Sequence, residues 1–516
     1  MAEATANDYA RSVVQDFAPD AETPPARKPD EQPLVVLAGA SGFVGASLRI
    51  ALAERYRWRA LTRSEAIVNQ GETRDNTEWR LCDLYSLPRV EEAMEGADYA
   101  IYLVHSMLPS SRLVQAKFED LDLLLADNFA RAAEAAGVKH IMYLGGLIPD
   151  DDYLSPHLRS RQEVEHVLRS RGVPVTVLRA GLIIGPGGSS LRMLINLVRR
   201  LPIMLMPKWT YSETQSIDIR DAIRAFDFAM EDPKFWDGTY DLGGHEPMTY
   251  RDMILRTAKV LGRDPLAIDL PVNWFALSRQ WVSALSGVSS QLVNPLLESL
   301  RHSLHAKDNP LLDKIKPSAI TFEESLRSAV DKSGAPLPNP RSLTQATDDK
   351  LIKNARRVRS VQRMPLPSGW DAPYIAQVYG QWLTDKSIHL INVQRDESNM
   401  LQFMLQLPGF KLKLLELTPT PYTRGGGRRR AFYISGGFLA RQVDPPGRFE
   451  FRIFPENFCL IAAIHGFAPR LPWWFYECSQ AVVHYFVMQA FARYLWKQAK
   501  AGVSMPEPSE APLIQD

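Results

Sequence analysis

Residues 34–45 read LVVLAGASGFVG and decide the fold. A short apolar run comes first, as in the buried strand of a parallel sheet. Three glycines follow directly with the spacing G-x-x-G-x-x-G, and residues 46–55 continue in a helical pattern. A strand, a glycine-rich turn and a helix in this order predict a dinucleotide site, because the first backbone amides of the helix bind phosphates. The alternative interpretation is a tight structural turn that binds no ligand.

Each glycine of the turn has a separate predicted role. Gly39 permits the tight turn, Gly42 lets the backbone approach a pyrophosphate, and Gly45 lets the helix pack close to the sheet. The residues predicted to contact the cofactor here are Gly39, Ser41, Gly42, Phe43, Val44 and Gly45.

Strands and helices alternate after this turn. Further strands are expected at 58–62, 99–104, 140–144 and 173–179, and a long helix at 115–136. Such alternation predicts an α/β fold, a Rossmann-type doubly wound parallel sheet with helices on both faces. This domain is expected to span 33–330, with a small substrate subdomain at about 245–330.

The C-terminal part of the chain has a different pattern. Residues 448–454 alternate polar and apolar side chains, 458–465 form a second expected strand, and 472–498 a long aromatic-rich helix. Strands followed by one long helix predict an α+β domain, which we place at 370–500. Residues 331–369 are expected to be a linker, and residues 1–32 and 501–516 disordered tails.

Composition narrows the class of protein. The chain has 516 residues, enough for two to four domains at about 150 residues each. Its 60 Lys and Arg balance 59 Asp and Glu, so no basic excess predicts a nucleic-acid partner. Three cysteines offer neither a disulfide framework nor metal-ligand spacing. With no signal peptide and no long apolar run, we expect a cytoplasmic protein without a metal.

The glycine turn in VLAGASGFVG resembles the extended and atypical short-chain dehydrogenase/reductase superfamily. Residues 155–190 and 241–253 are particularly similar to its NmrA-like and YbjT-like atypical reductases. The resemblance covers about 33–330 and implies a Rossmann fold that binds NAD(P). It also implies that Asp83 and Leu84 lie near the adenine, Val104 and His105 beside the nicotinamide ribose, and Ala180 and Gly181 along the nicotinamide.

Arg63 bears on the choice of dinucleotide. It ends the second expected strand, where an acidic residue would bind the ribose hydroxyls of NAD and a basic one the 2′-phosphate of NADP. Arg63 therefore favours NADP, with NAD as the alternative if this arginine is only a surface residue.

The usual catalytic residues of the superfamily are missing. Its reductases use a Ser or Thr and a Tyr with a Lys four residues later, whereas 145–147 reads GGL and the later pair aligns with His157 and Arg161. His157 is the first candidate for proton transfer and Arg161 for holding a ribose or phosphate. His105 is a second candidate. The alternatives are a surface His157 at a helix start and a His105 that only hydrogen-bonds within its loop.

The C-terminal domain resembles the DUF2867 region of YbjT-like proteins and a START-like (SRPBCC) helix-grip fold. This resemblance implies a cavity for an apolar molecule. The alternative is an ordinary core filled by Trp474, Tyr485, Phe486 and Phe491. The aromatic segment 473–476 is also a candidate for peripheral membrane contact.

Two functions follow from these patterns. The first is an NADP-dependent oxidoreductase acting on an apolar, carbonyl- or quinone-like small molecule. The second is a non-catalytic NAD(P)H sensor or assembly factor whose C-terminal domain binds a ligand or lipid. The missing Ser and Tyr favour the second function, and the separate second domain favours an enzyme or a ligand carrier.

Overall fold

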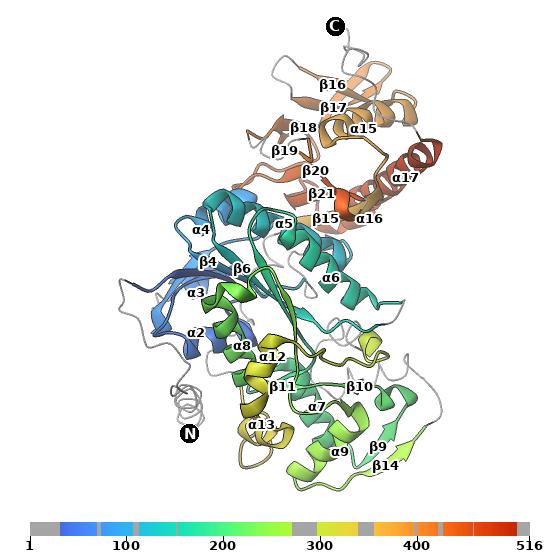
Figure 1. Ribbon diagram of the computed structural model, residues 1–516. Helices are drawn as coiled ribbons and strands as arrows, with labels where there is room; N and C mark the ends of the chain where they lie inside the picture. Colours follow the sequence, from blue (N-terminus) through green and yellow to red (C-terminus); the bar gives the residue numbers. More distant parts are fainter. Residues whose placement is uncertain are drawn as a thin grey trace. The chain divides into compact units, whose positions relative to one another are not determined.

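The computed structural model describes residues 31–69, 74–106, 113–150, 153–270, 297–338, 356–396, 400–421, 427–457 and 459–502 (Figure 1). The chain divides into two compact units. The first comprises residues 1–108 and 122–344, and the second comprises residues 109–121 and 345–516. Nearly all of both expected tails lies outside the described residues.

The first unit is built on a parallel seven-stranded sheet with the strand order β12-β7-β6-β4-β1-β2-β3. The predicted Rossmann-type doubly wound fold is confirmed. The direction of strand addition reverses between β1 and β4, which places the ligand crevice at their carboxyl ends. The strands are β1 (Leu34–Ala38), β2 (Arg57–Thr62), β3 (Thr77–Leu81), β4 (Tyr99–Tyr102), β6 (His140–Gly146), β7 (Val175–Ala180) and β12 (Thr239–Leu242).

Helices cover both faces of this sheet, and all five residues of β1 are therefore buried (Figure 1). Apolar side chains of α2, α8 and α12 share one core cluster with the sheet. Gly137, with φ +70°, ends α5. The helices are α2 (Phe43–Ala51), α3 (Glu65–Asn69), α4 (Leu87–Met94), α5 (Phe118–Ala136), α6 (Pro156–Arg169), α8 (Ile219–Glu231) and α12 (Pro310–Ile315).

A smaller subdomain follows β7 and has its own apolar cluster. It includes residues well before 245, so the expected boundary of 245–330 is too narrow. Its elements are β8 (Ile183–Ile184), α7 (Ser189–Arg200), β9 (Ile203–Met206), β10 (Glu213–Thr214), β11 (Ile217–Asp218), β13 (Met248–Thr249), α9 (Tyr250–Val260), β14 (Leu266–Asp269) and α13 (Phe322–Ser328).

The second unit has an eight-stranded sheet with the order β16-β17-β18-β19-β20-β21-β15-β5 and long helices packed on it. Neighbouring strands of this sheet are antiparallel, except for β5 and β15, which pair in parallel. The elements are β5 (Leu113–Gln115), β15 (Val358–Pro365), α15 (Ala372–Lys386), β16 (Ile391–Arg395), β17 (Leu401–Leu407), β18 (Phe410–Pro419), β19 (Arg429–Gly436), β20 (Arg448–Phe454), β21 (Cys459–Phe467), α16 (Trp473–Cys478) and α17 (Gln480–Ala501).

Three expectations about this unit are wrong. The expected linker at 331–369 contains strand β15. The helix expected at 115–136 begins at Phe118, three residues later than expected, because Leu113–Gln115 is strand β5. Two hydrogen bonds hold Gln115 in the second unit. The Gln115 side chain donates to the Ala481 carbonyl, and the Gln362 side chain donates to the backbone carbonyl of Gln115. The long terminal helix is interrupted at Ser479, whose φ of −123° and ψ of −86° are not helical.

The aromatic side chains of α16 and α17 do not share one environment. Phe491 is fully buried, as an ordinary core would require. Trp474, Tyr485 and Phe486 are exposed, so the expectation that all four fill a core is wrong for three of them. Tyr485 and Phe486 are exposed because the helical period places them off the stripe of α17 formed by the buried Ala481, Met488, Phe491 and Leu495, whereas Trp474 belongs to the separate short helix α16.

Candidate functional site

The glycine turn joins β1 to α2 at the carboxyl edge of the sheet. Gly39 has φ +89°, and a Cβ atom there would lie 3.0 Å from the Cβ of Leu103. A Cβ on Gly45 would overlap the carbonyl oxygen of Gly39 and lie 2.9 Å from the Cα of Ala40. These two positions therefore require glycine, one for its conformation and one for the close approach of helix and turn.

The start of α2 is open to a ligand. Gly42 is its N-cap, is exposed, and offers no side chain to the first amides of the helix. Helix N-termini with uncapped amides and the positive end of the helix dipole attract anions. The turn thus fits a pyrophosphate, and a side chain at Gly42 would intrude where the phosphates approach.

The other predicted cofactor residues lie at the ends of neighbouring strands. Arg63 follows β2 directly and is exposed, and no ion pair to it occurs among the described residues. Asp83 and Leu84 follow β3, where Asp83 accepts a hydrogen bond from the Tyr85 amide at 3.2 Å. Carboxyl ends of parallel strands meet at one edge, so these residues line the same edge as the glycine turn.

The nicotinamide end of this edge is formed by the ends of β4 and β7. Val104 and His105 follow β4, with Val104 half-buried and His105 exposed. Ala180 ends β7, and Gly181 follows it against Thr214 and the Gln215 carbonyl. The ring of Phe43 reaches Gly185, beyond β7, and thereby connects the glycine turn with this part of the site.

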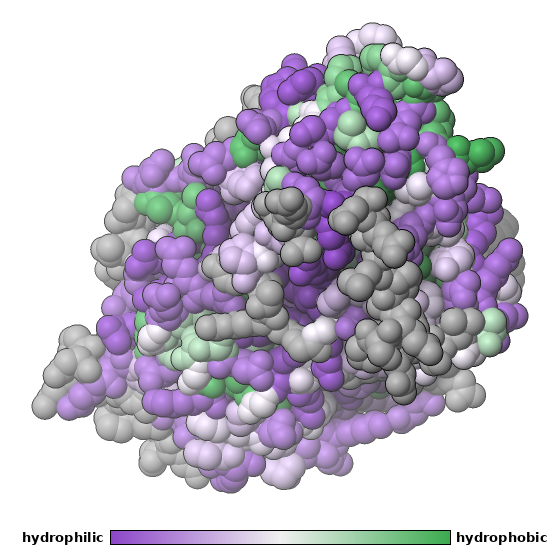
Figure 2. Space-filling view, turned by 90° about the horizontal axis from the view of Figure 1, so that it is seen from above, coloured by the Kyte–Doolittle hydropathy of each residue, from purple (hydrophilic) through white to green (hydrophobic). Residues whose placement is uncertain are grey.

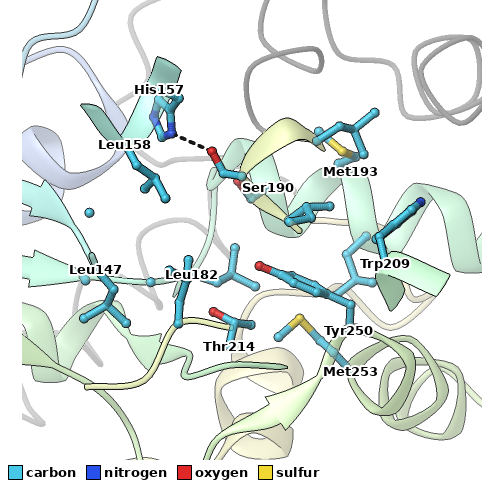
Figure 3. A pocket seen from close by; sticks show the side chains of 18 of the residues that line it. Leu147, His157, Leu158, Leu182, Ser190, Met193, Trp209, Thr214, Tyr250 and Met253 are labelled. Atoms are coloured by element: carbon cyan, nitrogen blue, oxygen red, sulfur yellow. Dashed lines mark hydrogen bonds between the residues drawn. The ribbon is translucent and has the colours of Figure 1, made fainter. Parts of the chain in front are cut away.

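A cavity of about 200 Å³ lies within the first unit, next to the ends of β6 and β7. Gly146, Ala180 and Gly181 form its wall toward the sheet, and α6, α7 and α9 contribute mostly apolar side chains (Figure 3). Its apolar lining consists chiefly of Leu147, Leu158, Leu182, Met193, Leu194, Leu197, Trp209, Met253, Ile254, Leu297, Leu300 and Leu304.

His157 is one of the few polar residues of the cavity. Its ring lies at the edge of the cavity (Figure 3). The Nδ1 atom of His157 lies 3.2 Å from the Ser299 hydroxyl, which in turn lies 2.9 Å from the Ser155 hydroxyl. Burial lowers the pKa of His157 to about 3, and the positive charge of Arg161 acts in the same direction. The ring is therefore neutral at physiological pH, so it has no imidazolium proton to donate to a substrate.

Arg161 forms a buried ion pair with Asp122. It is only 7% exposed, and its Nη2 lies 2.5 Å from Asp122 Oδ2. The Asp122 carboxylate also accepts hydrogen bonds from the Ser160 hydroxyl at 3.0 Å and the Ser106 amide at 2.6 Å. Arg161 thus fixes α6 to α5 and to the segment after β4, which indicates a positioning role more than direct contact with a ribose.

Tyr250 is the polar residue that sequence reasoning missed. It begins α9, packs its ring edge on Trp209, and points its hydroxyl into the cavity (Figure 3). Burial raises the pKa of Tyr250 to about 12, while a hydrogen bond with Thr214 lowers it in part. The phenol therefore keeps its proton at physiological pH. The sequence carries no signal for this role, because Tyr250 lies outside every catalytic motif.

The second unit contains a separate apolar cavity of about 160 Å³. Phe403, Leu417, Ile434 and Phe449 are among its lining residues. His484 lies on this cavity with Nε2 3.2 Å from the Ser360 hydroxyl, and burial lowers its pKa to about 4.

Neither a metal centre nor a membrane-spanning helix is found in the described part of the chain. It holds no group of three or more His, Cys, Asp or Glu side chains placed to bind a metal ion. None of its helices is long and apolar enough to cross a membrane.

Comparison with known proteins agrees with this geometry. Residues 39–193 match the NAD(P)H-binding family. The chain is 26% identical to ceramide reductase of Caulobacter vibrioides over 285 residues, which are 54% of this chain and 87% of the relative. It is 27% identical to sanguinarine reductase of Eschscholzia californica over 203 residues, 31% of this chain and 73% of the relative.

A third relative matches over a shorter stretch. The auxiliary protein GraX of Staphylococcus aureus is 29% identical over 123 residues, 23% of this chain, and the match spans only 39% of GraX. The Rossmann-type sheet of the first unit and the match over residues 39–193 thus agree on an NAD(P)H-binding fold.

Proposed function

We propose that this chain is an NADPH-dependent reductase of an apolar small molecule that carries a carbonyl or quinone oxygen. The observation that carries the proposal is the cavity beside Gly146, Ala180 and Gly181, at the edge of an NAD(P)H-binding sheet. Apolar walls with a few polar groups are typical of small-molecule sites. Two of the relatives are named as reductases, of ceramide and of sanguinarine, which supports the reaction class.

Different residues of the chain have different roles in this reaction. Bound NADPH supplies the hydride that is added to the substrate carbon. The glycine turn and the start of α2 hold the pyrophosphate, and the apolar cavity excludes water from the reacting centre. Tyr250 donates a proton to the substrate oxygen as negative charge develops there, and it regains a proton from solvent. Thr214 stabilises the phenolate that forms in between.

Replacing Tyr250 by Phe tests the proposal. Wild-type protein should oxidise NADPH in the presence of a panel of small benzoquinones and aromatic aldehydes. Tyr250→Phe should lower kcat/KM by about a hundredfold, because a general acid is lost, while the Kd for NADPH is unchanged. Tyr211→Phe, at an exposed tyrosine, is the matched control. Equal activity of the two variants would show that Tyr250 is not the proton donor.

Arg63→Asp tests the choice of cofactor. The affinity for NADPH should fall by about tenfold to a hundredfold and the affinity for NADH should change much less, because only NADPH carries the 2′-phosphate. Fluorescence titration with both dinucleotides measures this difference. Arg80→Asp, at an exposed arginine of β3, controls for the change in net charge. An equal loss for NADPH and NADH would refute the proposed contact.

The cavity of the second unit supports a second candidate, a ligand-binding protein that uses NAD(P)H as a signal. Its lining is almost entirely apolar, and the Ser and Tyr of the usual reductases are missing from the first unit. The same panel separates the two candidates. Tight NADPH binding without turnover of any quinone or aldehyde would favour the second one.

A further inference from the structure

An apolar surface on α16 and α17 is not explained by the proposed reaction. Six large apolar side chains are exposed over residues 474–486, and Trp496, farther along α17, is exposed as well. The six are Trp474, Phe475, Val482, Val483, Tyr485 and Phe486. Trp474 is 70% exposed and Phe486 59%. Four of these six residues are aromatic, and we refer to the six together as the aromatic patch. Figure 2 shows hydrophobic groups on the side of the second unit where these helices lie, within a largely hydrophilic surface.

The aromatic patch lies off the core stripe of α17, although Val483 also lines the cavity of the second unit. The core stripe of α17 consists of Ala481, Met488, Phe491 and Leu495, all buried. α17 therefore has an apolar face beyond the one that its own sheet requires. A contiguous apolar patch exposed to water usually marks an interaction site.

The C-terminal half of α17 adds positive charge to the same side of the helix. Arg493, Lys497 and Lys500 are exposed. They follow Phe486 at 7, 11 and 14 residues, spacings that return to one face of an α-helix. Between residues 468 and 502 the sequence has four basic residues and a single acidic one, Glu477. The surface is thus apolar and aromatic at one end, and at the other end it combines the basic residues with the exposed Trp496, whose ring lies under the Lys500 ammonium.

We propose that this face of α16 and α17 binds the surface of an anionic lipid bilayer. Trp, Tyr and Phe side chains partition into the interface between lipid headgroups and acyl chains, and lysine and arginine attract anionic headgroups. A second copy of the chain is a poorer occupant. A two-fold interface would bring this same face of two copies together, and between residues 468 and 502 it offers a single carboxylate, Glu477, to four basic residues. The sequence predicts membrane contact at residues 473–476. Of these, Trp474 and Phe475 are exposed whereas Tyr476 is buried, and the proposal extends the contact to α17.

Co-sedimentation of the full-length protein with vesicles tests the proposal. Wild-type protein should bind vesicles of phosphatidylcholine mixed with phosphatidylglycerol, and bind pure phosphatidylcholine more weakly. The triple variant W474S/F475S/F486S should bind the mixed vesicles at least about tenfold more weakly, because the inserted side chains are lost. Phe410→Ser, which removes an exposed aromatic side chain elsewhere in the same unit, should bind as the wild type does.

A charge variant provides an independent readout. R493Q/K497Q/K500Q should bind both kinds of vesicle equally, because the attraction to phosphatidylglycerol is removed. Failure of the wild type to bind either kind of vesicle would overturn the proposal. So would binding of W474S/F475S/F486S to the mixed vesicles as tightly as the wild type binds them. A dimer that the triple variant dissociates, without vesicle binding, would identify a second copy as the occupant. None of these measurements depends on reductase activity.

Discussion

Replacing Gly42 by Asp is expected to abolish NADPH binding and leave the fold intact. The carboxylate would lie at the start of α2, where the pyrophosphate is proposed to bind. Two unit charges about 4 Å apart repel by about 4 kcal/mol near a protein surface. This corresponds to about a thousandfold loss of affinity. Fluorescence titration with NADPH measures the loss.

The backbone at Gly42 explains why stability should survive this change. Its φ of −76° and ψ of 176° suit any residue, and Asp is a favoured N-cap. A Cβ there would lie 3.2 Å from the Gly39 carbonyl oxygen, a tight contact that a small shift relieves. We expect the free energy of unfolding to stay within about 1 kcal/mol of wild type.

The matched control is Gly42→Asn, which has nearly the same shape and no charge. It should retain much more affinity for NADPH than the Asp variant does. If Gly42→Asp binds NADPH as tightly as the wild type, the phosphates do not lie at this turn.

Replacing Asp122 by Asn is expected to destabilise the first unit strongly. Asp122 is fully buried, and its carboxylate is the partner of the buried Arg161 guanidinium. Asn keeps the shape and removes the compensating charge. Breaking a buried ion pair in this way costs about 3–5 kcal/mol. Urea unfolding, followed at the transition of the first unit, measures the change.

Asp98→Asn is the control for the removal of a carboxylate. Asp98 pairs with Lys139, whose side chain is largely exposed, and exposed pairs contribute about 1 kcal/mol or less. Equal losses in the two variants would show that Asp122 is not needed to compensate Arg161. A loss confined to Asp122→Asn would confirm that this pair holds α6 in place beside the cavity.

Much of the fold follows from local patterns. The strand, the glycine turn and the helix of residues 34–45 are contiguous, and each requirement is met by the backbone of a few neighbouring residues. The same is true of the end of α5 at Gly137 and of the existence of strand β20. The alternation of β20 is typical of a half-buried strand, but its polar Glu450 and Arg452 are also buried, as an ion pair. Strand β5 could not be predicted, because three residues carry no readable period and the pairing partner, β15, lies more than 240 positions away.

The residues of the candidate site likewise fall into those that local sequence predicts and those that depend on tertiary packing. The carboxyl-edge residues, from Gly39 and Arg63 to Gly181, follow from the order of strands, since parallel strands bring their carboxyl ends to one edge. The cavity does not follow from it. His157 meets Ser299 across 142 positions, and Arg161 meets Asp122 across 39. Only packing decided that His157 is neutral and that Tyr250 directs its hydroxyl into the cavity.

The sequence by itself determined the Rossmann-type sheet and the dinucleotide turn, because both depend on backbone geometry that adjacent residues dictate. The tertiary structure alone decided which polar groups share the cavity, which charges are buried in pairs and which aromatic side chains remain in solvent. These properties depend on burial and on the distance between side chains far apart in the chain, and burial sets both the pKa of a group and the energy of a pair.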